Sequence, residues 1–178
     1  MTRRGFVKLA ALAGASLLPS PVLAGLRPAI GPERTLSFYN LHTGESLRTV
    51  YRAADGYVVS ALADIDHILR DFRANEVKPI DPRLLDLLFA IRSRLGTREP
   101  FHVISGYRSP LTNAMLHARS EGVAAHSLHV EGKAIDIRVP GQNLAMLRSV
   151  ALELRRGGVG YYPTSNFVHV DTGRVRFW

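Results

Sequence analysis

Two short segments in which apolar and polar residues alternate impose the strongest constraint on the fold. They cover residues 133–139 and 167–171, and each is typical of a β-strand, because successive side chains of a strand point to opposite faces. When the isoleucine and valine side chains of both segments face a core, Asp136, His169 and Asp171 face the other way. We therefore expect two strands of one antiparallel sheet that present these three side chains on a common face.

The rest of the chain predicts helices that cover such a sheet. Apolar residues recur at helical spacing in residues 58–72, 82–95, 110–119 and 144–154. Asp81, Pro82 and Gly96 are typical of an N-cap, a first helical residue and a helix stop, so the second helix has defined ends. Further strands are expected at residues 35–41, 46–53, 101–104 and 159–163. This order of elements indicates an α+β fold with an antiparallel sheet packed by several helices.

The helix expected at residues 110–119 follows a glycine-containing turn at residues 105–110. This turn carries Arg108, so we expect a guanidinium group at the rim of the sheet. The apolar residues of the helix are expected to face inward; they are Leu111, Ala114, Met115 and Ala118.

The N-terminal segment has the layout of an export signal. Arg3 and Arg4 precede a short apolar run at residues 9–18. The paired arginines resemble a twin-arginine signal, with an ordinary secretory signal as the alternative. The apolar run is shorter than the roughly 20 residues that cross a bilayer, so no permanent membrane anchor is expected. We predict a signal peptide at residues 1–24 and a single domain at residues 25–178.

The residue composition narrows the functions open to the chain. Lys and Arg outnumber Asp and Glu by 23 to 15, which favours contact with anionic cell-wall polymers or lipid head groups outside the membrane. The expected export signal and the lack of a cluster of basic and aromatic residues argue against binding of nucleic acid. The chain has no cysteine, so a bound metal ion would need His, Asp or Glu ligands.

His129, Asp136 and His169 form a candidate metal site. A catalytic zinc ion typically has three protein ligands drawn from His, Asp and Glu, and this set supplies two imidazoles and one carboxylate. Gly132 allows the sharp turn that would bring His129 back over the sheet. In the alternative interpretation both histidines are ordinary polar residues and Asp136 is a surface acid. Spacing alone leaves the two interpretations open.

A family resemblance favours the metal site. The segment Ser127-x-His129-x-x-Gly132-x-Ala134-x-Asp136, followed by a histidine in a late strand, resembles the zinc motif of the D-alanyl-D-alanine carboxypeptidase and dipeptidase family. That family belongs with the lysostaphin-type peptidases and the hedgehog fold. Residues 105–110, 158–163 and 167–174 resemble a bacterial branch of exported proteins that includes murein endopeptidases. The resemblance implies that His129, Asp136 and His169 bind one zinc ion per chain.

The resemblance also implies an activity. The expected reaction is hydrolysis of an amide bond that involves a D-amino acid in peptidoglycan stem peptides or cross-links, outside the cytoplasm and, in a bacterium with two membranes, in the periplasm. Whether the bond is a D,D cross-link, an L,D cross-link or a terminal D-alanine stays open. Arg108 matches the arginine that binds a substrate carboxylate or stabilises the tetrahedral oxyanion, with a structural salt bridge as the alternative. Ser127, the first residue of the motif, is expected to help bind the substrate.

The catalytic base is the point at which the chain departs from the family. Better-known members place an acid three residues before the last histidine ligand, where this chain has Asn166, and others have a histidine at the position of Phe167. We expect Asp171 to act as the base or, alternatively, to orient a ligand imidazole. His126 and Glu131 are further candidates. A zinc-stabilised domain that binds peptidoglycan without cutting it is the alternative function, and a peptidase that acts on ordinary L-peptides is a third.

Overall fold

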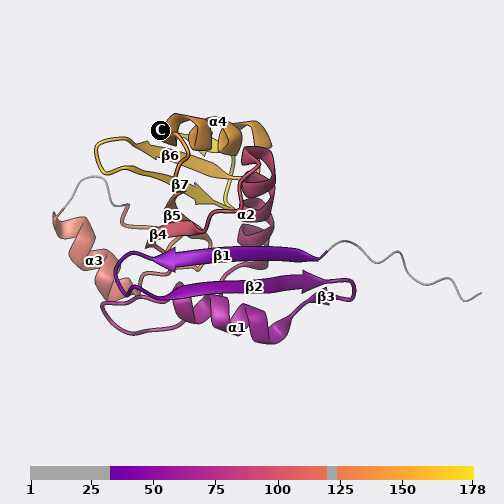
Figure 1. Ribbon diagram of the computed structural model, residues 1–178. Coiled ribbons are helices and arrows are strands. Elements are labelled where there is room, and N and C mark those ends of the chain that lie inside the picture. The colour runs from indigo at the N-terminus through magenta and orange to yellow at the C-terminus, as the bar shows by residue number, and fades with distance from the viewer. Residues whose placement is uncertain (1–32, 120–123) are drawn as a thin grey trace, which may run out of the picture.

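In the computed structural model, one sheet of eight strands runs through the part of the chain that the structure describes, residues 33–119 and 124–178. The predicted signal peptide, residues 1–24, lies outside the described residues. The strand order is β3-β2-β1-β4-β5-β7-β6-β8 (Figure 1). The strands are β1 (Arg34–Asn40), β2 (Ser46–Ala53), β3 (Gly56–Tyr57), β4 (Phe101–Ser105), β5 (Ala134–Arg138), β6 (Gly158–Tyr162), β7 (Phe167–Asp171) and β8 (Arg176–Phe177).

The four central strands pair antiparallel, as the sequence predicts. β5 lies between β4 and β7, and β7 pairs with β6. The sheet as a whole is mixed, because β1 pairs with β4, and β6 with β8, in parallel. The expected α+β class is confirmed, and the antiparallel part is the part that carries the candidate site.

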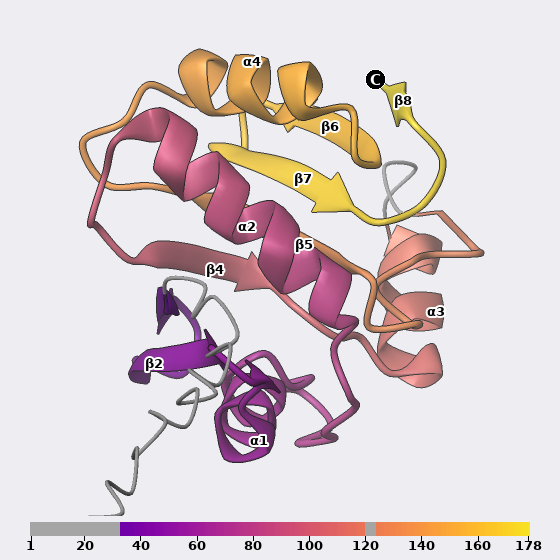
Figure 2. The same cartoon turned by 90° about the vertical axis from the view of Figure 1, so that its right-hand side faces the viewer.

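Four helices accompany the sheet in the described residues: α1 (Val59–Ile68), α2 (Pro82–Leu95), α3 (Pro110–Arg119) and α4 (Leu144–Leu154). Figure 2 shows α2 lying across β4 and β5, with α4 beside β6 and β7. Ile135, Ile137, Val168 and Val170 are fully buried in the core that the sheet shares with α2 and α4. None of the helices in the described residues is long and apolar enough to cross a membrane.

The start of α2 ties the scaffold to the candidate site. Asp81 caps the helix as predicted, since its Oδ1 accepts a hydrogen bond from the backbone N–H of Arg83 at 2.9 Å. The same residue donates its backbone N–H to the carbonyl of Gly132 at 2.9 Å, and its Oδ2 accepts from the Thr172 hydroxyl at 2.9 Å. One residue thus links the helix to the loop before β5 and to the end of β7. Gly96 ends the helix with a φ of +63°, also as predicted.

The expected inward face of α3 is wrong. Leu111 is 79% exposed and Ala114 is also exposed, whereas Thr112 and Asn113 are buried. Polar contacts decide the orientation of this helix. The Asn113 side-chain amide donates to the carbonyl oxygens of Ala124 and Ala125, both at 3.2 Å. Apolar spacing predicted the helix but not the face that packs.

A buried carboxylate holds the turn that carries Arg108. Asp71 is 1% exposed, and its Oδ2 accepts a hydrogen bond from the backbone N–H of Ser109 at 2.9 Å. Its Oδ1 accepts from the backbone N–H of Arg73 at 3.0 Å. Burial raises the pKa of this carboxyl, but hydrogen bonds from Thr112 and Ser109 outweigh burial and hold the pKa below its usual value.

We expect Asp71→Asn to destabilise the fold at pH 7 by about 1–3 kcal/mol, because a buried charged acceptor of backbone N–H groups is lost. The folded-state pKa of Asp71 lies below the unfolded one, so its contribution is present above about pH 4 and is lost as the pH falls through the folded pKa. The difference between variant and wild type should therefore shrink at pH 3. Urea unfolding at pH 7 and pH 3 measures both values. The exposed Asp55→Asn serves as the control, and an equal difference at both pH values would contradict the assignment.

Candidate metal centre

Strand register brings Asp136 and His169 together. Asp136 of β5 pairs directly with His169 of β7, and Ala134 pairs with Asp171. Ile135 and its partner Val170 point into the core, so the alternating pattern sends Asp136 and His169 to the other face. The predicted common face is confirmed.

A tight loop carries His129 to the same place. The backbone N–H of Lys133 donates to the carbonyl oxygen of Leu128 at 2.9 Å. The backbone N–H of Gly132 donates to the carbonyl oxygen of His129 at 3.2 Å. Gly132 has a φ of +67°, and a Cβ there would lie 2.5 Å from the carbonyl oxygen of Pro79. Only glycine fits both the backbone conformation and the close approach. The sequence-based role of this glycine in turning the loop agrees with the structure.

Three side-chain atoms converge at the candidate site. Nε2 of His129 lies 3.2 Å from Oδ1 of Asp136 and 3.2 Å from Nδ1 of His169. Nδ1 of His169 lies 2.8 Å from the same carboxylate oxygen. All three residues are buried, and among the described residues they are the group of His, Asp and Glu side chains arranged to hold a metal ion.

Outer contacts determine where the two imidazoles carry their lone pairs. Nδ1 of His129 lies 2.7 Å from the carbonyl oxygen of Gly106, so this nitrogen is the donor. Nε2 of His169 lies 3.1 Å from Oδ2 of Asp171 and is the donor of that ring. In the neutral rings, the other nitrogen of each then directs a lone pair toward Asp136. Three electron-rich atoms so close together repel one another unless a metal ion lies between them or His169 carries a second proton.

The donor set and its spacing fit zinc. Zinc takes His nitrogen and carboxylate oxygen ligands at about 2.0–2.2 Å in a tetrahedral arrangement, for which two ligand atoms lie about 3.3–3.5 Å apart. The observed separations of 2.8–3.2 Å are slightly shorter than that range. His129, Asp136 and His169 would hold the ion, and the cleft that Arg108 lines adjoins them.

The electrostatics of the site favour one bound cation. Burial raises the pKa of Asp136, but the charges and hydrogen bonds of His129 and His169 outweigh burial and leave the pKa well below its usual value. Burial lowers the pKa of His129. Burial also lowers the pKa of His169, but hydrogen bonds with Asp136 and Asp171 raise it to about 9. Asp136 is thus an ionised carboxylate, which a metal ion or a proton on His169 neutralises.

Asp171 lies behind His169 and is fully buried. Its Oδ1 accepts from the backbone N–H groups of Gly158 at 2.9 Å and Gly173 at 2.8 Å. Its Oδ2 accepts from Arg176 at 2.8 Å and from the outer nitrogen of His169. Burial raises its pKa, but these hydrogen bonds, that of His169 first, hold the pKa well below its usual value. Both oxygens are occupied and lie away from the converging atoms.

A small cleft of about 80 Å³ adjoins the converging atoms. Arg108, Ser127 and His126 line it together with His129 and His169. The Arg108 side chain is 8% exposed, makes no ion pair within the described residues, and its Nε is buried without a hydrogen-bond partner there. The structure therefore gives no support to a structural salt bridge at Arg108. An unpaired buried guanidinium is suited to an anionic ligand.

The remaining candidates for the base differ in position. Glu131 does not line this cleft; it lines a neighbouring pocket and forms an ion pair with Lys133 at 2.7 Å.

Asn166 lies in the turn between β6 and β7 with a φ of +55°, a conformation that asparagine tolerates well. The turn explains an asparagine at this position, so it does not argue for a non-catalytic domain.

Sequence reasoning missed Trp178. Its ring lies 5.3 Å from that of His169, and its Nε1 donates to the hydroxyl of Tyr162 at 2.7 Å. Gly160 pairs with His169 in the sheet, and a Cβ at Gly160 would lie 2.8 Å from the Trp178 ring. A glycine in the middle of a strand was the available signal, because it often marks a close approach.

Comparisons with known proteins show the family of this chain. The family model described as peptidoglycan L,D-endopeptidase MepK matches residues 29–178. The peptidoglycan L,D-endopeptidase MepK of Escherichia coli (strain K12) is 48% identical, over 99% of this chain and 96% of the relative. A probable peptidoglycan L,D-endopeptidase MepK of Haemophilus influenzae is 46% identical, over 99% of this chain and 95% of the relative. The expected relation to murein endopeptidases is confirmed, and the chain belongs to the peptidoglycan L,D-endopeptidase MepK family.

Proposed function

We propose that this protein is a zinc-dependent peptidoglycan endopeptidase that cleaves L,D cross-links between stem peptides. The observation that carries the proposal is the convergence of two imidazole nitrogens and one carboxylate oxygen beside a cleft with an unpaired arginine. The names of the relatives give the bond type, which the residues of the site leave open. The substrate is the cell-wall polymer, in agreement with the basic composition.

His129, Asp136 and His169 would hold the zinc ion. When bound, zinc supplies Lewis-acid activation of the scissile carbonyl group and of a water molecule. Arg108 binds a carboxylate of the stem peptide or the negative charge that develops on the carbonyl oxygen. Ser127 lines the same cleft, where it can contact the substrate. Its hydroxyl oxygen also accepts a hydrogen bond from the backbone N–H of His129 at 3.3 Å, which helps to position this metal ligand.

We propose His126 as the general base in place of Asp171. His126 is exposed and lines the cleft with both ligand histidines. Asp171 is fully buried behind His169, and Glu131 is paired with Lys133 outside the cleft. A base must reach the water that attacks the carbonyl and later pass the proton to the leaving amine. Of these three residues, His126 alone has access to the cleft.

The function is tested by incubating zinc-loaded protein with purified cross-linked muropeptides and weighing the products. We expect cleavage of L,D cross-links, with His126→Ala lowering kcat by about 10²–10⁴-fold while the zinc content stays unchanged. His67→Ala is the matched control, because His67 is exposed on α1 and does not line the cleft. No new product from any cross-linked muropeptide would refute the endopeptidase. Full activity of His126→Ala would refute the base alone.

We propose that Asp171 positions His169 rather than abstracting a proton. We expect Asp171→Asn to weaken zinc affinity by about 10–100-fold, because the carboxylate no longer fixes the imidazole and its tautomer. Competition with a chromogenic chelator measures the affinity. Saturating zinc should then restore most of the cleavage rate. A base would behave differently, with zinc affinity unchanged and kcat low at every zinc concentration; the exposed Asp64→Asn is the control.

We further propose that residues 1–24 form a twin-arginine export signal and that residues 25–178 are the mature domain, which acts outside the cytoplasm. Arg3 and Arg4 before a short apolar run support this proposal, and so does a substrate that lies in the cell wall. N-terminal sequencing of the exported protein is expected to find Gly25 first. Recovery of the uncleaved chain from the cell wall fraction would contradict the boundary.

A further inference from the structure

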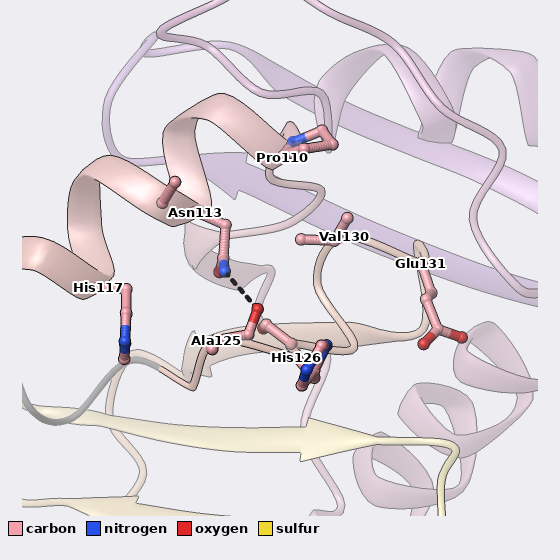
Figure 3. Close-up of a pocket in the computed structure, with 9 residues that line it drawn as sticks. Pro110, Asn113, His117, Ala125, His126, Val130 and Glu131 are labelled. Atoms are coloured by element: carbon pink, nitrogen blue, oxygen red, sulfur yellow. Dashed lines mark hydrogen bonds between the residues drawn. The ribbon is translucent and has the colours of Figure 1, made fainter.

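A pocket between α4 and β8 plays no part in the proposed reaction. Its volume is about 290 Å³, and its lining includes Arg148, Leu152, Arg155, Val159, Val175 and Phe177. The hollow in Figure 3, between α3 and residues 125–131, differs from it because that hollow shares His126 and Ser127 with the metal cleft. The α4–β8 pocket shares only Arg176 with the cleft, so it is a separate hollow.

Strand alternation places the α4–β8 pocket on the face of the sheet opposite the metal centre. Val159 of β6 lines the pocket and is buried in the core. The next residue, Gly160, pairs with His169 and therefore faces the other way. A ligand in this pocket would not compete with the substrate for the metal ligands.

Apolar side chains form one wall of the pocket. Phe177 is 71% exposed and Val175 is 54% exposed, and Leu152 of α4 lies opposite them in the lining. Covering such side chains with an apolar ligand is favourable. The volume lies at the lower end of the range of about 300–1,000 Å³ in which drug-sized ligands bind. The pocket therefore suits one large apolar side chain rather than a long acyl chain.

Arginine residues give the same pocket a positive charge. Arg148, Arg155 and Arg176 line it, and aspartate and glutamate are absent from the described residues that do so. Nε of Arg148 is buried and has no hydrogen-bond partner in the described residues. Its guanidinium lies over the ring of Tyr161, 5.1 Å from the ring centroid. A guanidinium that a ring holds in place, and that lacks an acceptor, is suited to a carboxylate.

Arg155 has an unusual backbone conformation. It caps the C-terminus of α4 with a φ of +50°, in the region that favours glycine. Among the described residues, the other non-glycine residues with a positive φ are Asn75 and Asn166, and asparagine tolerates this region well. Arg155 makes no ion pair within the described residues that would offset the cost. A disfavoured conformation at such a residue points to a function for its side chain.

The edge of the sheet gives the ligand a place for its backbone. β8 ends the strand order and pairs with β6 alone in the described residues, so an extended peptide can lie along its outer side. A peptide that combines one apolar side chain with a carboxylate directly beside it is a peptide at its C-terminal residue.

We propose that the α4–β8 pocket binds the C-terminal residue of a partner polypeptide. The apolar side chain of that residue packs against Phe177 and Leu152, and its carboxylate lies between Arg148 and Arg155. The inference goes beyond the proposed function and does not depend on it, because no metal ligand takes part.

The experiment measures binding of short fluorescein-labelled peptides to the zinc-loaded protein by fluorescence anisotropy. The peptides end in leucine, phenylalanine or valine with a free carboxylate, and we expect saturable binding. Amidation of the C-terminus should weaken binding by about tenfold or more, because charge-assisted hydrogen bonds are lost. Alanine as the last residue should also weaken binding by about tenfold or more, because less apolar surface is buried.

Arg155→Gly is the most informative variant, because glycine accepts the φ of +50° while the guanidinium is removed. Its affinity for the peptides should fall by about tenfold, and its rate of muropeptide cleavage should equal that of the wild type. Arg156→Gly is the matched control, since Arg156 is the adjacent exposed residue and does not line the pocket. Arg176 is left unchanged because it also donates to Asp171.

Equal affinity for the free acid and the amide would overturn the proposal, and so would wild-type affinity in Arg155→Gly. Absence of saturable binding for every peptide would have the same meaning. The protein could instead bind vesicles of phosphatidylglycerol and no peptide, and lose the vesicles in Phe177→Ser. That result would assign this surface to a membrane and reject the polypeptide.

Discussion

Replacing His169 by alanine is expected to remove both zinc binding and peptidoglycan cleavage, with the cleavage rate falling by about 10³-fold or more. The substitution deletes one of three converging ligand atoms, whose nearest neighbour, Oδ1 of Asp136, lies 2.8 Å away. It also leaves Asp136 buried beside a single imidazole, so two ligands remain where a catalytic zinc ion needs three. Zinc content after dialysis and the rate of muropeptide cleavage give the two measurements.

A second histidine in the sheet provides the control for this prediction. His102→Ala alters β4, where the ring packs on Tyr39 at 5.1 Å, and should retain zinc and most of the activity. Treatment of the wild type with a chelator should reproduce the loss seen in His169→Ala, and added zinc should reverse it only in the wild type. Turnover and full zinc content in His169→Ala would show that the metal is held elsewhere.

The other large effect is expected from Gly106→Ala, which should lower the free energy of unfolding by at least about 3 kcal/mol. A Cβ at this position would lie 2.4 Å from the carbonyl oxygen of Leu69, a buried backbone atom that accepts the N–H of Tyr107. The backbone must therefore shift. The carbonyl oxygen of Gly106 also accepts a hydrogen bond from Nδ1 of His129. We therefore expect zinc affinity to fall together with the free energy of unfolding.

Urea unfolding with and without zinc, together with chelator competition, measures both consequences. Gly141→Ala is the comparison, because its φ is +70° but a Cβ there would meet nothing within 4 Å. Its cost should be limited to the backbone conformation, about 1–2 kcal/mol, with zinc affinity unchanged. If Gly106→Ala cost no more than Gly141→Ala, the close approach to Leu69 would not constrain the fold.

Local patterns in the sequence predicted most of the scaffold and the common face of the site strands. The alternation around Asp136 and His169 was sufficient because strand side chains have a period of two wherever the strand lies in the sheet. Asp81 and Gly96 predicted the ends of α2 because capping depends only on nearby backbone groups. In each case the deciding interaction lies within a few residues of the position that it determines.

Features that depend on contacts outside a regular helix or strand pattern were not predictable in this way. The buried face of α3 follows from contacts of Asn113 with residues 124–125, so apolar spacing gave the wrong side. The role of Asp171 stayed open because the sequence does not reveal that its oxygens are taken up by Gly158, Gly173 and Arg176. Apolar spacing and strand alternation predict which way a side chain faces, but they do not predict its hydrogen-bond partners.

The direct pairing of Asp136 with His169 makes the candidate site sensitive to folding errors. A slip of one residue between β5 and β7 would exchange the two faces of one strand and turn either ligand into the hydrophobic core. A chain misfolded in this way would lack the three converging ligand atoms of the proposed zinc site. Zinc present during refolding would then bind only correctly paired molecules and would stabilise them over slipped ones by mass action.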